Sequence, residues 1–334
     1  MNSAADLLID KVFSVSSSNF DELSIEVFNF QYENNNVYRQ YCDLLKILPS
    51  EVLSPYKIPF IPIQFFKSHV LKSTDFIVQK IFESSGTTGI INSKHYIKST
   101  NLYEKCFLKT FELFYGNVDQ YCILGLLPSY LEKGNSSLVY MVDKLIKLSK
   151  NRRSGFYLDE FENLNRQIIE NEVGGQKTIL IGVTYALLDF FDLFPMILNN
   201  TIIMETGGMK GRKKEMRRSE VHKKLKALCG VKEIHSEYGM TELLSQAYSK
   251  GNGIYSSPPW LRILTRDPED PFDISKSYTK SEGAANIIDL SNIYSCSFLQ
   301  TDDLAITFPD GNFEIVGRLE NSDLRGCGLM VAEF

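Results

Sequence analysis

The sequence lacks most of the features that set a protein apart from ordinary soluble enzymes. Among its 334 residues there are six cysteines, widely spaced and without a C-x-x-C pair. That usage argues against a zinc site and a disulfide framework, and it predicts mostly reduced thiols. No apolar run approaches the roughly 18 residues of a membrane-spanning helix, and the N-terminus has no secretory signal. We expect a cytoplasmic protein without membrane insertion.

An excess of positive charge is also missing. The formal net charge is −5, which gives no general attraction to nucleic acid, so no nucleic-acid partner is expected. The 43% hydrophobic and 23% charged residues match the averages of soluble globular proteins. Residues 210–218 are a local exception, with six basic residues among nine. A solvated helix face and a docking face for an acidic partner both remain open there.

What the sequence does contain is an alternation of strand-like and helix-like segments. Short β-type runs such as 178–183 and 201–204 alternate with segments whose apolar residues have helical spacing. This alternation predicts a layered α/β fold, and the strand signals of the last third predict a β-rich C-terminal part. Residues 1–70 are predicted to be a helical lead-in that packs on a main domain of residues 71–334. A basic helix is expected over 212–228.

The segment Ser84-Ser85-Gly86-Thr87-Thr88-Gly89 follows a strand predicted over 76–82 and combines four hydroxyls with two glycines. Glycines let backbone N–H groups turn toward an anion, and hydroxyls add neutral donors. The segment is therefore a candidate phosphate-binding loop. It is not a Walker A loop, because Ile91 stands where that motif has its second glycine. A Ser/Thr/Gly surface turn is the structural alternative.

A second cluster is Glu-Tyr-Gly-Met-Thr-Glu at residues 237–242. Tyr238 can stack on a base, Thr241 can bond a phosphate, and Glu242 can hold Mg²⁺ as a hard oxygen ligand. A helix start with a buried tyrosine is the structural alternative. Nearby His235 can polarise a substrate carboxylate or serve as a hydrogen-bonded structural histidine.

A third cluster is Thr301-Asp302-Asp303, which lies between two β-type runs and precedes Arg318 by fifteen residues counted from Asp303. A carboxylate at a strand end can bind both hydroxyls of a ribose, and an arginine can meet ribose or phosphate. An aspartate-rich hairpin turn is the structural alternative.

Taken in this order, the three clusters resemble the motifs of the adenylate-forming superfamily of acyl-CoA synthetases, luciferases and peptide-synthetase adenylation domains. The resemblance covers about residues 75–334 and implies ATP and Mg²⁺ as cofactors. It also implies that Gly207 and Gly208 match the paired glycines of the adenine pocket. The roles it implies are phosphate contacts from Ser84, Ser85, Gly86, Thr87, Thr88 and Gly89, adenine packing by Tyr238, catalytic α-phosphate contact by Thr241, catalytic Mg²⁺ binding by Glu242, and ribose contacts from Asp303 and Arg318.

The sequence departs from the superfamily pattern in three places. The family's x-P-K after the loop is replaced by Ile90-Ile91-Asn92, with Lys94 two positions late. The T-G-D motif stands as Thr301-Asp302-Asp303, which leaves the ribose ligand open between two aspartates. Only sixteen residues follow Arg318, so the mobile C-terminal domain of the superfamily is expected to be absent.

This ending resembles the LuxE-type acyl-protein synthetases, a branch in which a cysteine near the C-terminus receives the acyl group as a thioester. Cys327, between Gly326 and Gly328, stands at the matching place. A thiolate is a strong nucleophile toward an acyl phosphate anhydride, and the glycines give the backbone freedom to approach it. A small buried cysteine is the structural alternative.

The resemblance therefore implies a two-step acid–thiol ligase. ATP and a carboxylic acid, expected to be fatty, give acyl-AMP and pyrophosphate. Cys327 then takes the acyl group and passes it to a thiol or to an acceptor protein such as a reductase or an acyl carrier protein. Two alternatives remain: a CoA ligase or acyltransferase of the phenylacetate-CoA ligase branch, and a non-catalytic nucleotide-binding subunit of a complex.

Overall fold

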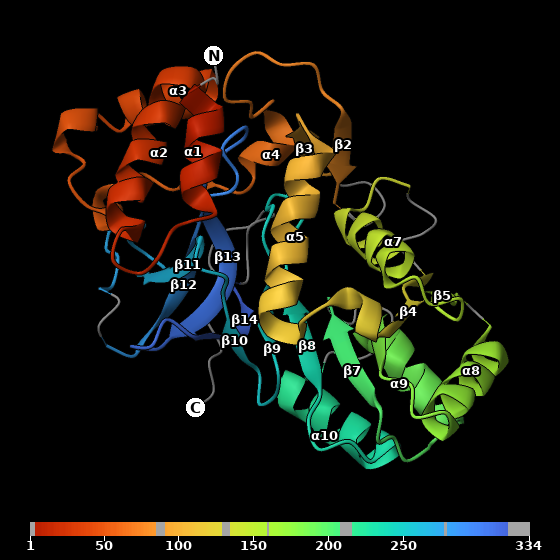
Figure 1. The fold of residues 1–334 in the computed structure, drawn as a ribbon. Helices are drawn as coiled ribbons and strands as arrows, with labels where there is room; N and C mark the ends of the chain where they lie inside the picture. The colour runs from red at the N-terminus through yellow and green to blue at the C-terminus, as the bar shows by residue number, and fades with distance from the viewer. Residues whose placement is uncertain are drawn as a thin grey trace. The chain divides into compact units, whose positions relative to one another are not determined.

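The computed structural model describes residues 4–84, 91–128, 134–158, 160–207, 216–276 and 279–319. The chain divides into two compact units (Figure 1). Unit 1 combines residues 1–75 with 259–334, and unit 2 comprises residues 76–258. No helix among the described residues is long and apolar enough to cross a membrane.

Unit 2 is an α/β layer built on parallel strands. Its strands are β2 (Lys80–Glu83), β3 (Lys94–Ile97), β4 (Cys122–Leu126), β5 (Gly155–Phe156), β6 (Thr178–Val183), β7 (Thr201–Thr206), β8 (His235–Tyr238), β9 (Ala247–Ser249) and β10 (Ile254–Ser256). Strands β5, β4, β6, β7 and β8 lie side by side in that order, all parallel, and β9 and β10 extend them antiparallel. Strands β2 and β3 form a separate hairpin.

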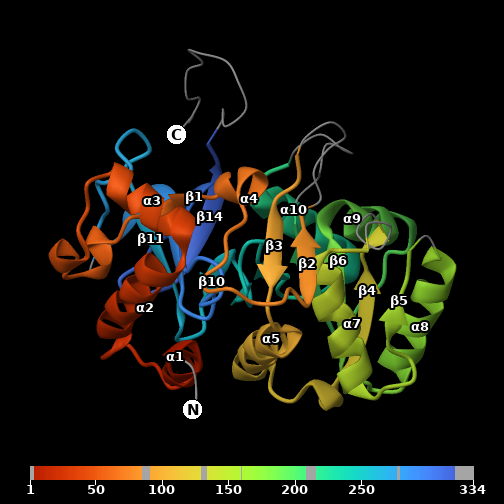
Figure 2. The ribbon, with the colours of Figure 1, turned by 90° about the horizontal axis from the view of Figure 1, so that it is seen from above.

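Helices cover both faces of the parallel strands. They are α5 (Thr100–Tyr115), α7 (Ser137–Ser149), α8 (Phe161–Val173), α9 (Thr184–Leu193), α10 (Arg218–Cys229) and the short 3-10 helix η3 (Val118–Gln120). Helices α9 and α10 lie on one face, and α5 and α7 on the other (Figure 2). The approach of α9 is close, because a Cβ at Gly182 of β6 would lie 2.7 Å from Leu187 Cγ. The predicted layered α/β fold is confirmed.

Unit 1 combines helices from the start of the chain with strands from its last third. Its elements are α1 (Ala4–Val12), α2 (Phe20–Asn34), α3 (Asn36–Leu44), η1 (Pro49–Glu51), η2 (Pro55–Lys57), β1 (Ile61–Pro62), α4 (Phe65–Ser68), β11 (Leu261–Arg266), β12 (Ser281–Asp289), β13 (Phe298–Thr307) and β14 (Phe313–Arg318). Strands β11 to β14 pair antiparallel in chain order, and β1 pairs parallel with β13. The β-rich C-terminal part is therefore confirmed.

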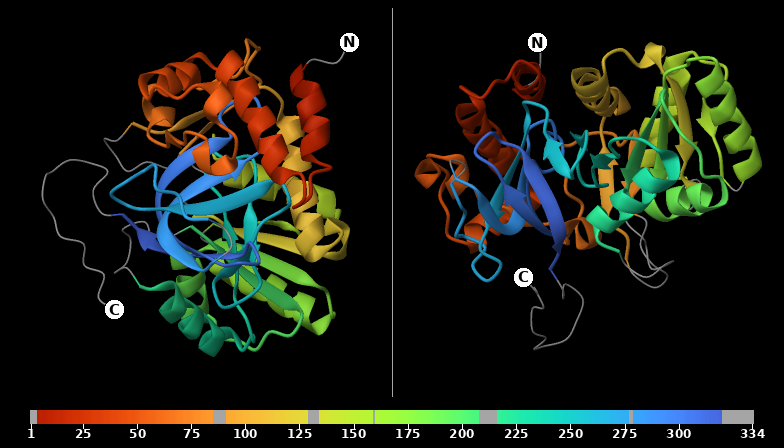
Figure 3. Two further views of the ribbon diagram at one scale, coloured as in Figure 1. Left: turned by 90° about the vertical axis from the view of Figure 1, so that its left-hand side faces the viewer. Right: turned by 90° about the horizontal axis from the view of Figure 1, so that it is seen from below.

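The core of unit 1 forms where the helices meet β13 (Figure 3). Phe298 is fully buried, and its ring contacts Phe28 of α2, Tyr38 of α3 and Phe60, with centroid distances of 6.4, 6.1 and 6.2 Å. These contacts join residues more than 200 positions apart in the chain. The helical lead-in is thus packed by aromatic side chains onto the β-rich part.

Two predicted boundaries are wrong in part. The strand expected over 76–82 begins at Lys80, since Ile77 is 93% exposed and has no burial to favour a strand there. The helix expected over 212–228 begins at Arg218 and ends at Cys229; residues 216 and 217 precede it, and 208–215 lie outside the described residues. The division between residues 1–70 and 71–334 stays a prediction, and the structure groups 1–75 with 259–334.

Gln31 of α2 is a buried amide that ties the helix to the turn before β13. Its Nε2 lies 3.0 Å from the Asn292 carbonyl oxygen and 3.1 Å from that of Ile293, and its Oε1 accepts from the Ser297 N–H at 2.9 Å. An unsatisfied buried polar group costs roughly 1–3 kcal/mol. Gln31→Leu should therefore lower the free energy of unfolding by about 3 kcal/mol.

Fluorescence of Trp260 during urea unfolding measures this change, because Trp260 is the single tryptophan, belongs to unit 1 and is 3% exposed. Gln40→Leu is the matched control, since Gln40 is exposed on α3 of the same unit. An equal decrease in the free energy of unfolding in both variants would contradict the conclusion that the hydrogen bonds of buried Gln31 stabilise the turn before β13.

Candidate functional site

The carboxyl ends of β7 and β8 lie side by side and carry two of the predicted site residues. Thr206 of β7 pairs with Glu237 of β8, so Gly207 and Tyr238 follow at neighbouring positions. In open α/β sheets, ligands bind in the crevice outside such strand ends. Tyr238 is 9% exposed, and its ring packs edge-on against Tyr255 with 5.9 Å between centroids.

Ser84, the first residue of the predicted phosphate loop, is hydrogen-bonded to Ser93 at the loop end of the β2–β3 hairpin. Its N–H donates to the Ser93 carbonyl oxygen at 3.1 Å, and its Oγ accepts from the Ser93 N–H at 2.9 Å. The Ser84 hydroxyl thus fixes the point where the loop leaves the hairpin. Predicted site residues that lie outside the described residues are Ser85, Gly86, Thr87, Thr88, Gly89, Gly208 and Cys327.

The hairpin is held against the segment that carries Thr241 and Glu242. His95 of β3 is 1% exposed, and its Nδ1 lies 2.8 Å from the Thr241 carbonyl oxygen. Because a carbonyl oxygen only accepts, His95 donates from Nδ1. The structure therefore holds the β2–β3 hairpin, which carries Ser84, against the backbone of the segment of Thr241 and Glu242 within unit 2.

Glu242 is 6% exposed, so its carboxylate is a buried hard-oxygen donor. Magnesium in nucleotide enzymes takes one or two carboxylates together with phosphate oxygens and water. Among the described residues there is no group of three or more His, Cys, Asp or Glu side chains that could form an all-protein metal cage. A single buried carboxylate fits Mg²⁺ that arrives with a nucleotide.

Glu237 is a buried carboxyl to which the sequence motifs assign no role. It is 8% exposed, and Thr206 Oγ1 donates to its Oε2. Burial raises the pKa of Glu237 to about 7, and the Thr206 hydrogen bond offsets only part of that rise. Gly239 makes room for the carboxyl, because a Cβ there would lie 2.5 Å from Glu237 Oε1.

His235 has a structural hydrogen bond. Its Nδ1 lies 3.0 Å from the Tyr115 hydroxyl oxygen. Burial, together with the positive charge of Lys250, lowers the pKa of His235 to about 4, so the ring is neutral near pH 7. A neutral, partnered imidazole fits the structural reading of this residue.

Sequence reasoning also missed a buried network around Glu205, two positions before Gly207. Its partners come from β8, from the start of α9 and from α10: Ser236, Thr184, Arg218 and His222. The one signal that could have found it is a glutamate near the end of a buried strand, beside the paired glycines.

Asp303 and Arg318 face each other in unit 1. They are paired residues of β13 and β14, and Arg318 Nε lies 3.2 Å from Asp303 Oδ1. The Asp303 side chain is 13% exposed and that of Arg318 is 71% exposed. The fifteen-residue spacing in the sequence is thus an antiparallel hairpin that places a carboxylate beside a cation.

The neighbouring Asp302 has a different partner. Gln64 Nε2 donates to Asp302 Oδ2 at 2.8 Å. The pairing with β12 is irregular here, because Ala284 pairs with Leu304 whereas Asn286 pairs with Gln300. Such a bulge re-aims side chains, which explains how two consecutive aspartates find separate partners.

The described cysteines are buried and form no disulfide with one another: Cys42, Cys106, Cys122, Cys229 and Cys296. Burial raises the pKa of Cys42 and of Cys296 to about 12, so both are neutral thiols near pH 7. Neutral buried thiols are poor nucleophiles.

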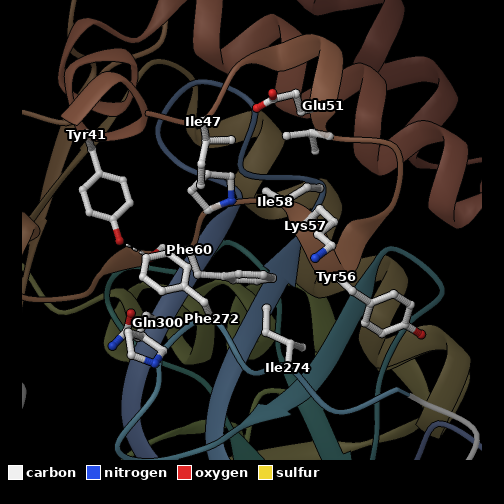
Figure 4. Close-up of a pocket in the computed structure, with 13 residues that line it drawn as sticks. Tyr41, Ile47, Glu51, Tyr56, Lys57, Ile58, Phe60, Phe272, Ile274 and Gln300 are labelled. Carbon is white, nitrogen blue, oxygen red and sulfur yellow. Dashed lines mark hydrogen bonds between the residues drawn. The ribbon is translucent and has the colours of Figure 1, made fainter. Parts of the chain in front are cut away.

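Unit 1 also contains a pocket of about 250 Å³ between the segment 41–60 and the segment 271–274 (Figure 4). Ile58, Phe60 and Ile274 are among its apolar lining, and Lys57 and Gln300 supply polar atoms. Among the described residues, no predicted site residue lines it.

The chain has the fold of the adenylate-forming ligases. It is similar to 2-hydroxyisobutyryl-CoA ligase, with a TM-score of 0.61 and 10% identity over 95% of this chain and 79% of that one. It is also similar to O-succinylbenzoate coenzyme A synthetase from Bacillus subtilis, with a TM-score of 0.52 and 16% identity over 74% of this chain. This chain spans 53% of that synthetase, about half its length.

Within this class, the chain belongs to the LuxE acyl-protein synthetase family, whose sequence model matches residues 13–334. It is 24% identical to a long-chain-fatty-acid–luciferin-component ligase of Vibrio harveyi, over 92% of this chain and 85% of the relative. A ligase of the same description from Aliivibrio fischeri is 22% identical, over 93% and 87%. The predicted ligase class is confirmed.

The raised pKa of Glu237 predicts how the free energy of unfolding changes with pH. A carboxyl of the unfolded chain titrates near 4.5, and that of folded Glu237 near 7. Between these values the folded state binds the additional proton, so stability falls as pH rises. Glu237→Gln keeps the shape of the neutral carboxyl and should remove this fall, leaving the variant about 3 kcal/mol more stable than wild type at pH 8.

Urea unfolding followed by circular dichroism at pH 5 and pH 8 measures the difference between the two proteins. Glu170→Gln, at an exposed position of α8, is the control and should follow the wild-type slope. Identical pH slopes for wild type and Glu237→Gln would show that Glu237 does not titrate in this range.

Proposed function

We propose that this protein activates a long-chain carboxylic acid with ATP and then carries the acyl group on Cys327 for delivery to an acceptor protein. The first step gives acyl-AMP and pyrophosphate, and the second gives a cysteine thioester and AMP. Membership of the acyl-protein synthetase family supports this reaction class. The description of both curated relatives as fatty-acid ligases supports the substrate class.

The observation that carries the proposal is the contact between His95 and Thr241. It holds the hairpin of the candidate phosphate loop against the segment of Thr241 and Glu242. Residues 84 and 241 are far apart in the chain, so neither motif predicts the other's position. The contact of His95 with Thr241 packs the hairpin against the segment that follows Tyr238, and a nucleotide site needs phosphate, metal and base contacts within one unit.

In the first step, an oxygen of the acid attacks the α-phosphorus of ATP, and the bond to the bridging oxygen of pyrophosphate breaks. The attack brings two anions together, so charge neutralisation and alignment are the main requirements. Bound Mg²⁺ would supply that neutralisation, with Glu242 as its protein ligand. Thr241 and the hydroxyls of the loop would hold the phosphates in line, and Tyr238 would pack on the adenine.

In the second step, the Cys327 thiolate attacks the acyl carbonyl carbon, a carbon–sulfur bond forms, and AMP leaves with the oxygen of the former anhydride. The thioester stays activated for transfer. The five described cysteines are buried, so none of them is exposed to compete for the acyl group.

The first step predicts ATP–pyrophosphate exchange that depends on a fatty acid and on Glu242. Glu242→Gln removes the charge of the metal ligand and should lower the exchange rate at least about 100-fold. Radiolabelled pyrophosphate exchange with acids of 8 to 16 carbons measures it. Glu162→Gln, at an exposed position of α8, should exchange at the wild-type rate.

Absence of exchange in the wild type with every acid would overturn the first step. Nucleotide binding without exchange would favour the non-catalytic alternative, and CoA-dependent AMP release would favour a CoA ligase.

The second step predicts that a variant can lose the acyl-enzyme thioester and still catalyse ATP–pyrophosphate exchange. Cys327→Ser should keep acid-dependent exchange within about twofold, since Cys327 enters only after the adenylate forms. Mass spectrometry of the intact protein after incubation with ATP, Mg²⁺ and the acid should show the acyl mass increment in wild type alone. The control is Cys229→Ser, which keeps the hydrogen bond that Sγ donates to the Leu225 carbonyl oxygen at 2.9 Å. An undiminished thioester on the Cys327→Ser protein would exclude Cys327.

A further inference from the structure

The carboxylate of Glu205, near the carboxyl end of β7, is contacted by side chains from β8, α9 and α10. Its side chain is buried and lies opposite Ser236 in the pairing of β7 with β8. Ser236 Oγ donates to Oε1 at 2.8 Å, and Thr184 Oγ1 lies 2.9 Å from Oε2. Two further groups approach Oε1: Arg218 Nε at 3.3 Å and His222 Nε2 at 3.5 Å.

Glu205 is ionised despite its burial. Burial alone would raise the pKa of this carboxyl, but the hydrogen bond from His222, the positive charge of Arg218 and the Ser236 hydroxyl together hold it below its usual value. Glu205 and Arg218 therefore form a charged pair within unit 2. The Glu205 side chain is 5% exposed and that of Arg218 is 30% exposed. Such a pair adds little net stability, because desolvation of the carboxylate offsets the attraction. The location of the Glu205–Arg218 pair, near Gly207 and Tyr238, is therefore more informative about its role than its contribution to stability.

One arm of the network reaches Gly207. The Thr184 hydroxyl that lies against Glu205 is also 3.0 Å from the Gly207 carbonyl oxygen. Thr184 is the first residue of α9, so the hydroxyl is fixed by a helix start at the carboxyl end of β6. The backbone of the predicted adenine wall is thereby linked to the buried carboxylate.

The other arm reaches Tyr238. The Arg218 guanidinium carbon lies 5.3 Å from the centroid of the Tyr255 ring, a cation–π distance. Tyr255 is 1% exposed and packs edge-on against Tyr238. Arg218 is thus fixed on one side by Glu205 and on the other by the ring that supports the predicted base-stacking residue.

We propose that Glu205 and Arg218 are positioning residues for the adenine of ATP. The ion pair between buried Glu205 and partly exposed Arg218 sets both the Gly207 backbone, through Thr184, and the Tyr238 ring, through Tyr255. The pair touches neither the acid nor the reacting phosphorus, so it acts on nucleotide affinity and leaves the chemical step unchanged. This inference rests on the proposed function, which assigns Gly207 and Tyr238 to the adenine site.

Two conservative variants test it. Glu205→Gln keeps the shape and removes the charge, and Arg218→Lys keeps the charge and removes the planar guanidinium that lies over Tyr255. Each should raise the Kd for ATP, measured by calorimetry, and the KM for ATP about 10-fold. The KM for the acid and kcat should stay within twofold. Arg217→Lys, the exposed neighbour just before α10, is the matched control and should bind ATP as wild type does.

A double-mutant cycle separates a positioning role of Arg218, exerted through Tyr255, from a general destabilisation of the fold. Because Arg218 acts through the Tyr255 ring, Arg218→Lys combined with Tyr255→Leu should raise the Kd for ATP no further than the larger single effect. Circular dichroism at the assay temperature establishes that each variant is folded.

The outcomes are distinguishable. If wild type binds no ATP, the proposed function fails, and this inference fails with it. If wild type binds ATP and both folded variants bind it equally well, the positioning role is wrong while the proposed function stands. Equal rises in the KM for ATP and for the acid, or strictly additive effects in the cycle, would show a structural role and overturn the proposal.

Discussion

The parallel pairing of β7 with β8 is the constraint on which the candidate site in unit 2 depends. Its register places Glu205 opposite Ser236 and Thr206 opposite Glu237. Because consecutive residues of a strand point to opposite faces, two glutamates are buried on the two faces of one strand pair. A slip of one residue would exchange these faces and leave both carboxyl groups without their partners. The register therefore fixes the positions of Gly207 and Tyr238 together.

The two glutamates have opposite protonation behaviour for a physical reason. Glu205 meets a guanidinium, an imidazole and hydroxyl groups, and these partners outweigh the cost of burying its charge. Glu237 has a hydroxyl partner in Thr206, and burial raises its pKa to about 7. The strand ends are thus held by an ion pair on one face and by a carboxyl that is neutral below pH 7 on the other. A neutral Glu237 adds no repulsion toward the phosphates of a nucleotide.

The sequence predicts the layers and the motif positions, because both depend on local patterns. Alternating apolar runs indicate the α/β layer, and helical spacing indicates the lead-in that becomes α1 to α3. The start of β2 was missed because the pattern at Ile77 cannot reveal whether a partner covers it. The surroundings of Glu205 and Glu237 were missed for the same reason, since their partners are separate elements. His95 and Thr241, 146 residues apart, meet through tertiary packing alone.

The structure also bears on the ambiguity between Asp302 and Asp303. Asp302 accepts a hydrogen bond from Gln64 at the junction of β1 and α4, so its carboxylate serves the packing of unit 1. Asp303 pairs with Arg318, whose side chain is 71% exposed. An ion pair with so exposed a cation contributes about 0–1 kcal/mol, so the Arg318 side chain can turn away from Asp303 at little cost. In our proposal Asp303 is therefore the ribose ligand, because the exposed arginine beside it can make way for two ribose hydroxyls.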